Sequence, residues 1–278
     1  MLKHIRNYYT EDEPLVYRIG WIPLKEPYAG SQDILLFVQF FSFEIRHPRG
    51  TAFLFHGYAS DSSWLSGIAG ALLQRGWAVV LTDLPGHGLS TGPRGDIETF
   101  FDYGDTVERV VTTMKALAST YLPEPYVAIG HSTGALALLD YSLRYQNRFS
   151  RFSLYAPLVR QVWWNTARVV RAVTKPFIAT TKALSRTPLG LRVFPLHWLD
   201  ELILWERWAR SHRFIPLPPT LVLQPEQDTV VDSRYNGRFI QSRSSTVTLK
   251  KLPDLTHFSL DSWNPNKALV DELLNFLE

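Results

Sequence analysis

The sequence predicts an α/β protein with a mostly parallel central sheet, because short apolar runs alternate with stretches of helical pattern along most of the chain. Runs of apolar and β-branched residues predict strands at residues 51–55, 78–82, 126–129, 152–155, 220–224 and 246–249. The stretches between them predict helices at about residues 63–75, 101–120, 135–145 and 233–241. An apolar run at 34–45 predicts antiparallel strands at the N-terminal edge of the sheet. The alternation breaks at residues 158–213. We therefore expect residues 1–157 and 214–278 to form one core, into which residues 158–213 are inserted.

The composition agrees with a single globular domain. A chain of 278 residues, with 45% hydrophobic and 20% charged residues, can bury a substantial core. The chain contains no cysteine, which excludes disulfides, a thiol nucleophile and thiolate metal sites. Residues 1–9 lack the apolar stretch of a signal peptide, and no run of about 18 apolar residues predicts a membrane span. We therefore expect a cytoplasmic protein.

A G-x-S-x-G motif at residues 130–134 lies between the predicted strand 126–129 and the helical stretch 135–145. This strand–turn–helix setting is the one that a nucleophile elbow requires, with the serine hydroxyl projecting above the sheet. Ser132 is therefore the predicted nucleophile. The two glycines are needed because the strand and the helix leave no room for side chains where they cross. The alternative is an ordinary turn in which Ser132 caps the helix, and more distant residues must decide between the two.

An acid and a histidine follow in the order that this chemistry requires, which is serine, acid, histidine. Asp228 comes just after the strand 220–224, and His257 comes after the strand 246–249. Such positions meet at the carboxyl edge of a parallel sheet, where catalytic loops collect. His257 is the last of the eight histidines and the only one after the acid. Ser132, Asp228 and His257 are therefore the predicted catalytic residues.

Three other acidic residues compete with Asp228. Asp232 is better suited to cap the helix predicted at 233–241, and Asp254 is too close to His257 in a short loop. Glu226 shares the loop with Asp228, which is preferred. His131, inside the motif, is interpreted as a packing residue.

A serine nucleophile also needs N–H donors for the developing oxyanion, each commonly worth about 3 kcal/mol. One donor is the backbone N–H of the residue after the nucleophile, which is Thr133. The other comes from the loop after an earlier strand. His56, Gly57 and Tyr58 follow the strand 51–55, and Tyr58 N–H is the expected second donor.

These motifs together resemble the α/β-hydrolase fold, and within it the monoacylglycerol lipase and lysophospholipase branch of the serine-aminopeptidase-like (S33) hydrolases. The resemblance covers roughly residues 50–278 and includes the segment DLPGHGLS at 83–90, which is specific to such hydrolases. It implies that Asp83 and His87 order the loop beside the elbow. One departure lies before His257, where residues 254–256 are larger than in many relatives.

The resemblance implies that the insertion at 158–213 forms a helical cap, or lid, over the active site. This segment has ten basic and three acidic residues, a net charge of +7 in a chain of +3. It also contains five of the nine tryptophans. We expect aromatic side chains of the cap to line the substrate pocket, and the candidates are Trp163, Trp164, Trp198 and Trp205.

Helical spacing separates apolar from basic residues in the first part of the cap. Trp163, Ala167, Val170 and Phe177 share one face, and Arg160, Arg168, Arg171 and Lys175 share the adjoining face. Such a helix either packs its apolar face on the core, which is the commoner case, or lies against an anionic membrane. Nucleic acid is a third partner of basic patches, but no recognisable binding module supports it, so we expect none.

The predicted function is therefore hydrolysis of carboxylic esters by a Ser-His-Asp triad, without metal or organic cofactor. The aromatic cap favours a medium or long acyl chain, and the resemblance implies monoacylglycerols or lysophospholipids as substrates. Two enzymatic alternatives use the same triad, a short-chain carboxylesterase and a hydrolase of carbon–carbon bonds. A non-catalytic binding protein with this fold is the remaining alternative, although such proteins often lack a triad residue and this chain has all three.

Overall fold

The structure is a computed structural model that describes residues 14–25, 33–44, 47–175, 178–182, 191–260 and 265–278. Within these ranges eight strands form one sheet, in the order β1-β2-β4-β3-β5-β6-β9-β10. They are β1 (Leu15–Pro23), β2 (Leu35–Phe43), β3 (Thr51–Phe55), β4 (Ala78–Thr82), β5 (Tyr126–His131), β6 (Arg151–Tyr155), β9 (Thr220–Pro225) and β10 (Val247–Leu252). β2 runs antiparallel to both of its neighbours, β1 and β4. The neighbouring strands β4, β3, β5, β6, β9 and β10 are all parallel to one another. The predicted α/β fold is confirmed.

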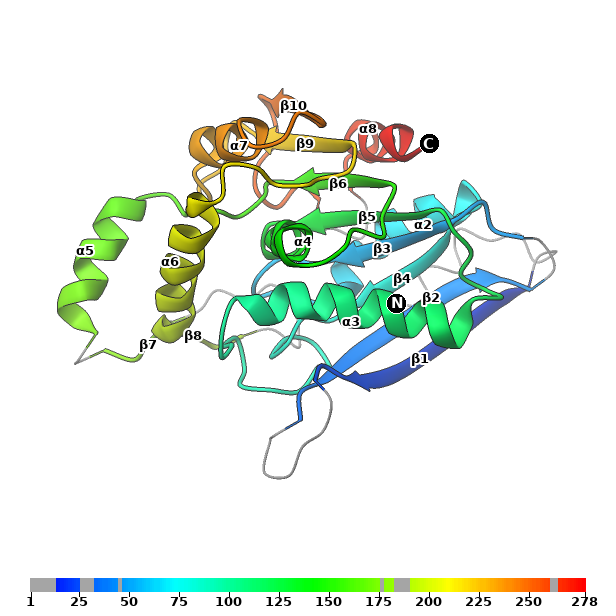
Figure 1. Cartoon of the computed structure of the whole chain (residues 1–278), viewed down its shortest axis with the longest axis horizontal. Coiled ribbons are helices and arrows are strands. Elements are labelled where there is room, and N and C mark those ends of the chain that lie inside the picture. Colours follow the sequence, from blue (N-terminus) through cyan, green and yellow to red (C-terminus); the bar gives the residue numbers. More distant parts are fainter. Residues whose placement is uncertain (1–13, 26–32, 45–46, 176–177, 183–190, 261–264) are drawn as a thin grey trace.

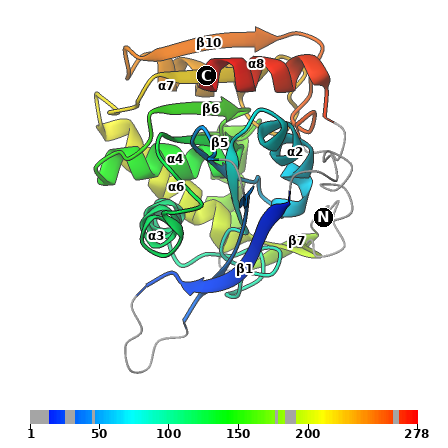
Figure 2. The same ribbon diagram turned by 90° about the vertical axis from the view of Figure 1, so that its right-hand side faces the viewer.

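Helices cover both faces of this sheet. α3 and α4 lie in front of the sheet in Figure 1 and α2 lies behind it, while α8 packs against α2 and β6 (Figure 2). The helices of the core are η1 (Ser62–Leu65), α2 (Ser66–Gln74), α3 (Phe101–Ala118), α4 (Thr133–Arg144), α7 (Ser233–Gln241) and α8 (Lys267–Leu277). With both faces covered, every residue of β3, β4 and β5 is buried. Because both faces of these central parallel strands are buried, their sequences are nearly continuous runs of apolar residues.

Two elements near the C-terminus differ from the prediction or go beyond it. β10 continues through Lys250 and Lys251 to Leu252, a stretch that was expected to be loop. Lysines are tolerated because β10 is the last strand of the sheet, and charges at a sheet edge also discourage pairing with other chains. α8 was not predicted, although Leu269, Val270, Leu273, Leu274 and Leu277 are buried with helical spacing.

The insertion, residues 158–213, lies between β6 and β9 and is called the cap below. It contains α5 (Trp164–Thr174), the antiparallel pair β7 (Thr180–Lys182) and β8 (Val193–Pro195), and α6 (Leu196–Ser211). α5 and α6 stand together at one end of the molecule (Figure 1). The β7–β8 pair is an addition to the predicted helical cap. Across the ranges that the structure describes, no helix is long and apolar enough to cross a membrane.

α6 is anchored on the core by its tryptophans. Trp198 and Trp205 are buried, and each indole N–H reaches a polar group of a core helix. Trp198 Nε1 donates to the Tyr103 hydroxyl, and Trp205 Nε1 donates to Asp140 Oδ1, both at 2.8 Å. Burial raises the pKa of Asp140 to about 6, although Arg144 and the bond from Trp205 oppose the rise. α6 therefore packs on the core, although the packing prediction was made for the preceding stretch at 160–177 and not for this helix.

α5 packs far less. Of its eleven residues only Trp164 and Arg171 are buried, whereas Val169, Val170 and Val173 are more than half exposed. The predicted apolar face differs at its first residue, and its last residue is not described. Trp163 precedes the helix with a positive φ of 62°, and Phe177 lies outside the described residues.

The predicted basic face of this region is largely neutralised. Arg160 precedes α5 and pairs with Glu206 of α6 at 2.6 Å. Arg171 and Lys175 both pair with Asp200 of α6, at 2.9 and 3.3 Å. A helix packed on the core by its apolar face would leave these charges solvated, but α6 brings two carboxylates to three of them, and of the three Lys175 stays 65% exposed. Of the four, Arg168 alone has no ion pair within the described part of the chain.

Candidate active site

The backbone at Ser132 has the strained conformation expected of a nucleophile elbow. β5 ends at His131 and α4 begins at Thr133, so Ser132 alone makes the turn, with φ 50° and ψ −108°. A non-glycine residue in this region costs on the order of 1–3 kcal/mol and persists only where its surroundings enforce it. Ser132 N–H donates to Tyr155 O at 3.0 Å, which ties the turn to β6.

The two glycines of the motif are required by close backbone contacts, as predicted. A Cβ on Gly134 would lie 2.1 Å from Phe55 O, and one on Gly130 would lie 2.7 Å from Ala135 Cα. Both distances are shorter than any van der Waals contact. Any side chain at either position would push α4 away from β3 and β5.

The structure brings together the three residues predicted to be catalytic. Ser132 Oγ lies 3.1 Å from His257 Nε2, and His257 Nδ1 lies 2.8 Å from Asp228 Oδ2. Ser132 and His257 are each 4% exposed, and the Asp228 side chain is fully buried. Asp228 Oδ1 accepts the N–H groups of Val230 and Val231, at 2.8 and 2.9 Å, so both carboxylate oxygens are fixed.

The acids that competed with Asp228 have other partners. Asp232 caps α7 by accepting the Tyr235 N–H at 2.9 Å, as the sequence predicts. Glu226 lies 3.4 Å from Lys251 at the exposed edge of the sheet. Asp254 is exposed. Of these acids, Asp228 is the one within hydrogen-bond distance of the His257 ring.

Two residues position the loop that carries His257. His131 Nε2 lies 2.9 Å from His257 O, and the Tyr155 hydroxyl donates to Thr256 O at 2.6 Å. The strands β5 and β6 thus contact the histidine loop at their carboxyl ends. His131 was predicted to be a packing residue, and it is buried. The role of Tyr155 had no sequence signal, because a tyrosine that ends a buried strand reads as core.

The loop expected to supply the second oxyanion donor lies against the elbow. A Cβ on Gly57 would lie 2.9 Å from His131 Nδ1 and 3.3 Å from Ser132 Cβ, so glycine allows the loop to approach the elbow this closely. His56 Nε2 accepts the Leu84 N–H at 2.9 Å, and His56 Nδ1 lies 2.7 Å from Gly57 O. The backbone before Tyr58 is therefore braced from two sides.

The segment at residues 83–90 orders the neighbouring loop, as the resemblance implied. Asp83 accepts the N–H groups of Ser62 and Leu89, both at 2.7 Å. Gly88 has a φ of +49°, and a Cβ there would lie 2.0 Å from the Asp83 carboxylate. His87 is buried beneath Tyr58, with ring centroids 5.1 Å apart, and burial lowers its pKa to about 3. His87 is therefore neutral at physiological pH.

The four cap tryptophans occupy different places. Trp198 packs on the Tyr58 ring, with centroids 4.4 Å apart, so the cap contacts the expected oxyanion loop. Trp205 is buried against α4 through Asp140, and Trp164 is buried at the start of α5. Trp163 is 78% exposed. Trp198 is the one that the structure places beside a predicted site residue.

The eight-stranded mixed sheet, with a strained serine between β5 and α4, defines an α/β-hydrolase. The profile of the family described as serine aminopeptidase, S33, matches residues 46–261. The chain belongs to this family.

Curated relatives match shorter stretches. A monoglyceride lipase homolog of Monkeypox virus is 33% identical over 116 residues, which is 41% of this chain and 41% of that protein. The probable lysophospholipase BODYGUARD 4 of Arabidopsis thaliana is 25% identical over 116 residues, 41% of this chain and 26% of that protein. The caffeoylshikimate esterase of the same plant is 34% identical over 98 residues, 33% of this chain and 27% of that protein. The matched stretches thus span less than half of each relative.

Solved structures share the fold over nearly the whole chain. A soluble variant of monoglyceride lipase from Saccharomyces cerevisiae, in complex with a substrate analog, has a TM-score of 0.70 at 17% identity, covering 97% of both chains. A monoacylglycerol lipase from Paleococcus ferrophilus has a TM-score of 0.67 at 18% identity, covering 87% of this chain and 99% of that one.

Proposed function

We propose that this protein is a serine hydrolase that cleaves carboxylic esters through an acyl-enzyme, with Ser132 as nucleophile, His257 as base and Asp228 as the acid that orients the base. The observation that carries the proposal is the continuous line of contacts from Ser132 Oγ to His257 Nε2 and from His257 Nδ1 to Asp228 Oδ2. Asp228 favours the tautomer with a proton on Nδ1, which leaves Nε2 free to accept the serine proton.

The reaction has two displacement steps. His257 Nε2 takes the proton from Ser132 Oγ while Oγ bonds to the ester carbonyl carbon, and the carbonyl electron pair moves onto oxygen. The N–H groups of Tyr58 and Thr133 donate to this oxyanion. The bond to the alcohol then breaks, and the alcohol takes the proton from His257. Water, deprotonated in turn by His257, attacks the acyl carbon and releases the acid, and Ser132 regains its proton.

Monoacylglycerol-like or lysophospholipid-like esters are the proposed substrates. Two relatives are named as a monoglyceride lipase homolog and a probable lysophospholipase, and the aromatic cap offers the apolar surface that an acyl chain needs. Trp198 is the cap residue that we propose to contact the acyl chain near the ester bond that is cleaved. Trp164, Trp198 and Trp205 are buried and Trp163 is exposed, so contact of any of the four with an acyl chain requires the cap to rearrange around the ligand.

Short-chain esterase activity is the second candidate function, and the relative named as a caffeoylshikimate esterase supports it. Fluorophosphonate labelling of the folded protein first tests for a serine hydrolase of any kind, and a protein that binds but does not react would remain unlabelled. A series of p-nitrophenyl and glyceryl esters of increasing acyl length then separates the two candidates. We expect kcat/KM to rise from acetate to medium or long chains. A preference confined to acetate would exclude the lipid substrates.

The outer face of α5 supports a proposed contact with a membrane surface. Trp163, Val169, Val170 and Val173 are all more than half exposed on or beside this helix, and the surrounding cap is strongly basic. A helix with exposed apolar residues next to cations is suited to the interface of an anionic bilayer. Contact with the bilayer interface would place the cap next to the membrane in which lipid esters are dissolved.

Trp198→Leu is expected to lower kcat by about ten- to a hundredfold with little change in KM for a small soluble ester. Trp198 packs on Tyr58, and a loosened loop misplaces a donor whose complete loss commonly costs about a hundred- to a thousandfold. Steady-state kinetics on a p-nitrophenyl ester measure the effect. Tyr103→Phe is the matched control, because it removes the hydrogen bond to Trp198 but keeps the ring on Tyr58. Equal losses in the two variants would contradict a positioning role for Trp198.

A further inference from the structure

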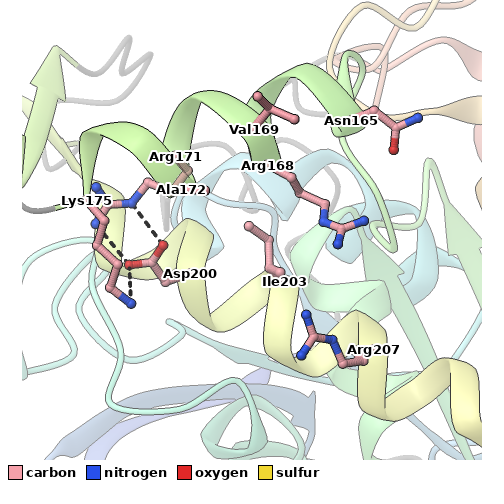
Figure 3. A pocket seen from close by; sticks show the side chains of 9 residues that line it. All are labelled: Asn165, Arg168, Val169, Arg171, Ala172, Lys175, Asp200, Ile203 and Arg207. Carbon is pink, nitrogen blue, oxygen red and sulfur yellow. Dashed lines mark hydrogen bonds and ion pairs between the residues drawn. The ribbon is translucent and has the colours of Figure 1, made fainter.

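A groove runs between α5 and α6 on the outer part of the cap, with a volume of about 570 Å³ (Figure 3). Its apolar wall consists of Val169 and Ala172 from α5 and Ile203 from α6. Asn165 lies at one end of the groove and Asp200 near the other. Four cations complete the lining: Arg168, Arg171, Lys175 and Arg207.

The groove is electrostatically uneven. At one end, Asp200 accepts two hydrogen bonds of 2.9 Å from Arg171 and lies 3.3 Å from Lys175, so one carboxylate already serves two cations. At the other end, Arg168 of α5 and Arg207 of α6 both line the groove beside Ile203 (Figure 3). In the described ranges neither arginine makes an ion pair or hydrogen bond. The lining therefore has a net charge of +3, concentrated where no carboxylate lies.

We propose that Arg168 and Arg207 bind the phosphate group of an anionic phospholipid at the bilayer surface. Two guanidinium groups that line one end of a groove without a carboxylate give it a positive potential, which a bound phosphate would neutralise. Guanidinium groups donate paired hydrogen bonds that match phosphate oxygens. Asn165, at the same end, adds a neutral donor.

The apolar surroundings indicate a lipid rather than a free phosphate ion. Val169 lines the groove and is 67% exposed, and Val173, one turn further along α5, is 69% exposed. A free ion gains nothing from these side chains. A phospholipid would place its phosphate between the arginines and its glycerol and first methylenes beside the valines. This site deepens the proposed membrane contact of α5 by naming the lipid group that it recognises.

The test compares vesicles of phosphatidylcholine alone with vesicles that also contain phosphatidic acid, and measures the full-length chain bound by co-sedimentation. The test variant is Arg168→Gln/Arg207→Gln. The matched control is Arg192→Gln/Arg210→Gln, which removes two exposed cap charges outside the groove. We expect the groove variant to lose about ten- to a hundredfold in affinity for the anionic vesicles, and the control at most a few-fold. Binding to neutral vesicles should be equally weak for all three proteins.

Three outcomes would overturn the proposal. Equal losses in the two double variants would show diffuse electrostatic attraction without a site. Wild-type binding that does not depend on phosphatidic acid would show apolar contact alone. Competition at constant ionic strength by inorganic phosphate at no higher concentration than the phosphatidic acid would show that the groove takes a free ion and that the valines add nothing. Because the assay involves no turnover, it gives an answer even if Ser132 is not a nucleophile, and an unchanged thermal unfolding temperature of the groove variant shows that its fold is intact.

Discussion

Ser132→Ala is expected to reduce ester hydrolysis by roughly 10⁵-fold or more and to abolish covalent labelling by a fluorophosphonate. The hydroxyl is the only group of the proposed mechanism that bonds to the substrate, and its loss leaves only binding and the oxyanion donors. The free energy of unfolding should change little, because alanine can keep the backbone turn and the variant loses only the contact between the serine hydroxyl and His257 Nε2. Thermal unfolding of the variant beside the wild type checks this point.

Ser142→Ala is the matched control for Ser132→Ala. Ser142 is also buried and lies on the same helix, but its hydroxyl donates to Leu138 O at 2.9 Å within α4. We expect wild-type turnover and labelling from this variant. Labelling that persists in Ser132→Ala would identify a different nucleophile and would refute the proposed mechanism.

Asp228→Asn is expected to lower kcat by about 10⁴-fold while leaving the shape of the site intact. An amide in place of the carboxylate no longer favours the proton on His257 Nδ1, and it no longer stabilises the imidazolium that forms during the reaction. The backbone N–H groups of Val230 and Val231 can still donate to the side-chain oxygen, so the loop should keep its conformation. Steady-state kinetics at several pH values measure the loss.

The competing acids provide the controls for Asp228. Asp232→Asn should keep kcat and the α7 cap, since asparagine caps helices about as well as aspartate. Glu226→Gln removes an exposed ion pair with Lys251, and such pairs contribute about 0–1 kcal/mol. A large loss of kcat in either variant, with Asp228→Asn active, would move the orienting role to that residue.

The residues of the proposed mechanism could be predicted because each leaves a local sequence signal. Ser132 is flanked by the two glycines of the motif. Glycine is required at position 134 because a Cβ there would clash with Phe55 O. Asp228 and His257 each follow a strand of a parallel sheet, and such strand ends share one edge. Order along the chain was therefore sufficient to select two residues that contact His257, Ser132 at 3.1 Å and Asp228 at 2.8 Å.

The cap was less predictable, because helical spacing describes one helix and not its neighbours. The sequence places Arg160, Arg171 and Lys175 beside an apolar face, and solvated charges were the natural expectation. α6 brings Glu206 and Asp200 to these side chains from 25 to 46 residues away along the chain. Which cations remain without a partner depends on such long-range pairing.

The sequence by itself determined the parallel sheet, the strained turn at Ser132 and the order of the acid and the base, because all three follow from local backbone geometry and from the alternation of strands and helices. Only the tertiary structure decided how the histidine loop is braced by Tyr155, how Trp198 reaches Tyr58, and how Arg168 and Arg207 come to line one groove. Each of these contacts joins separate elements. Their distance and direction depend on how helices and strands pack, and no local pattern of residues encodes that packing.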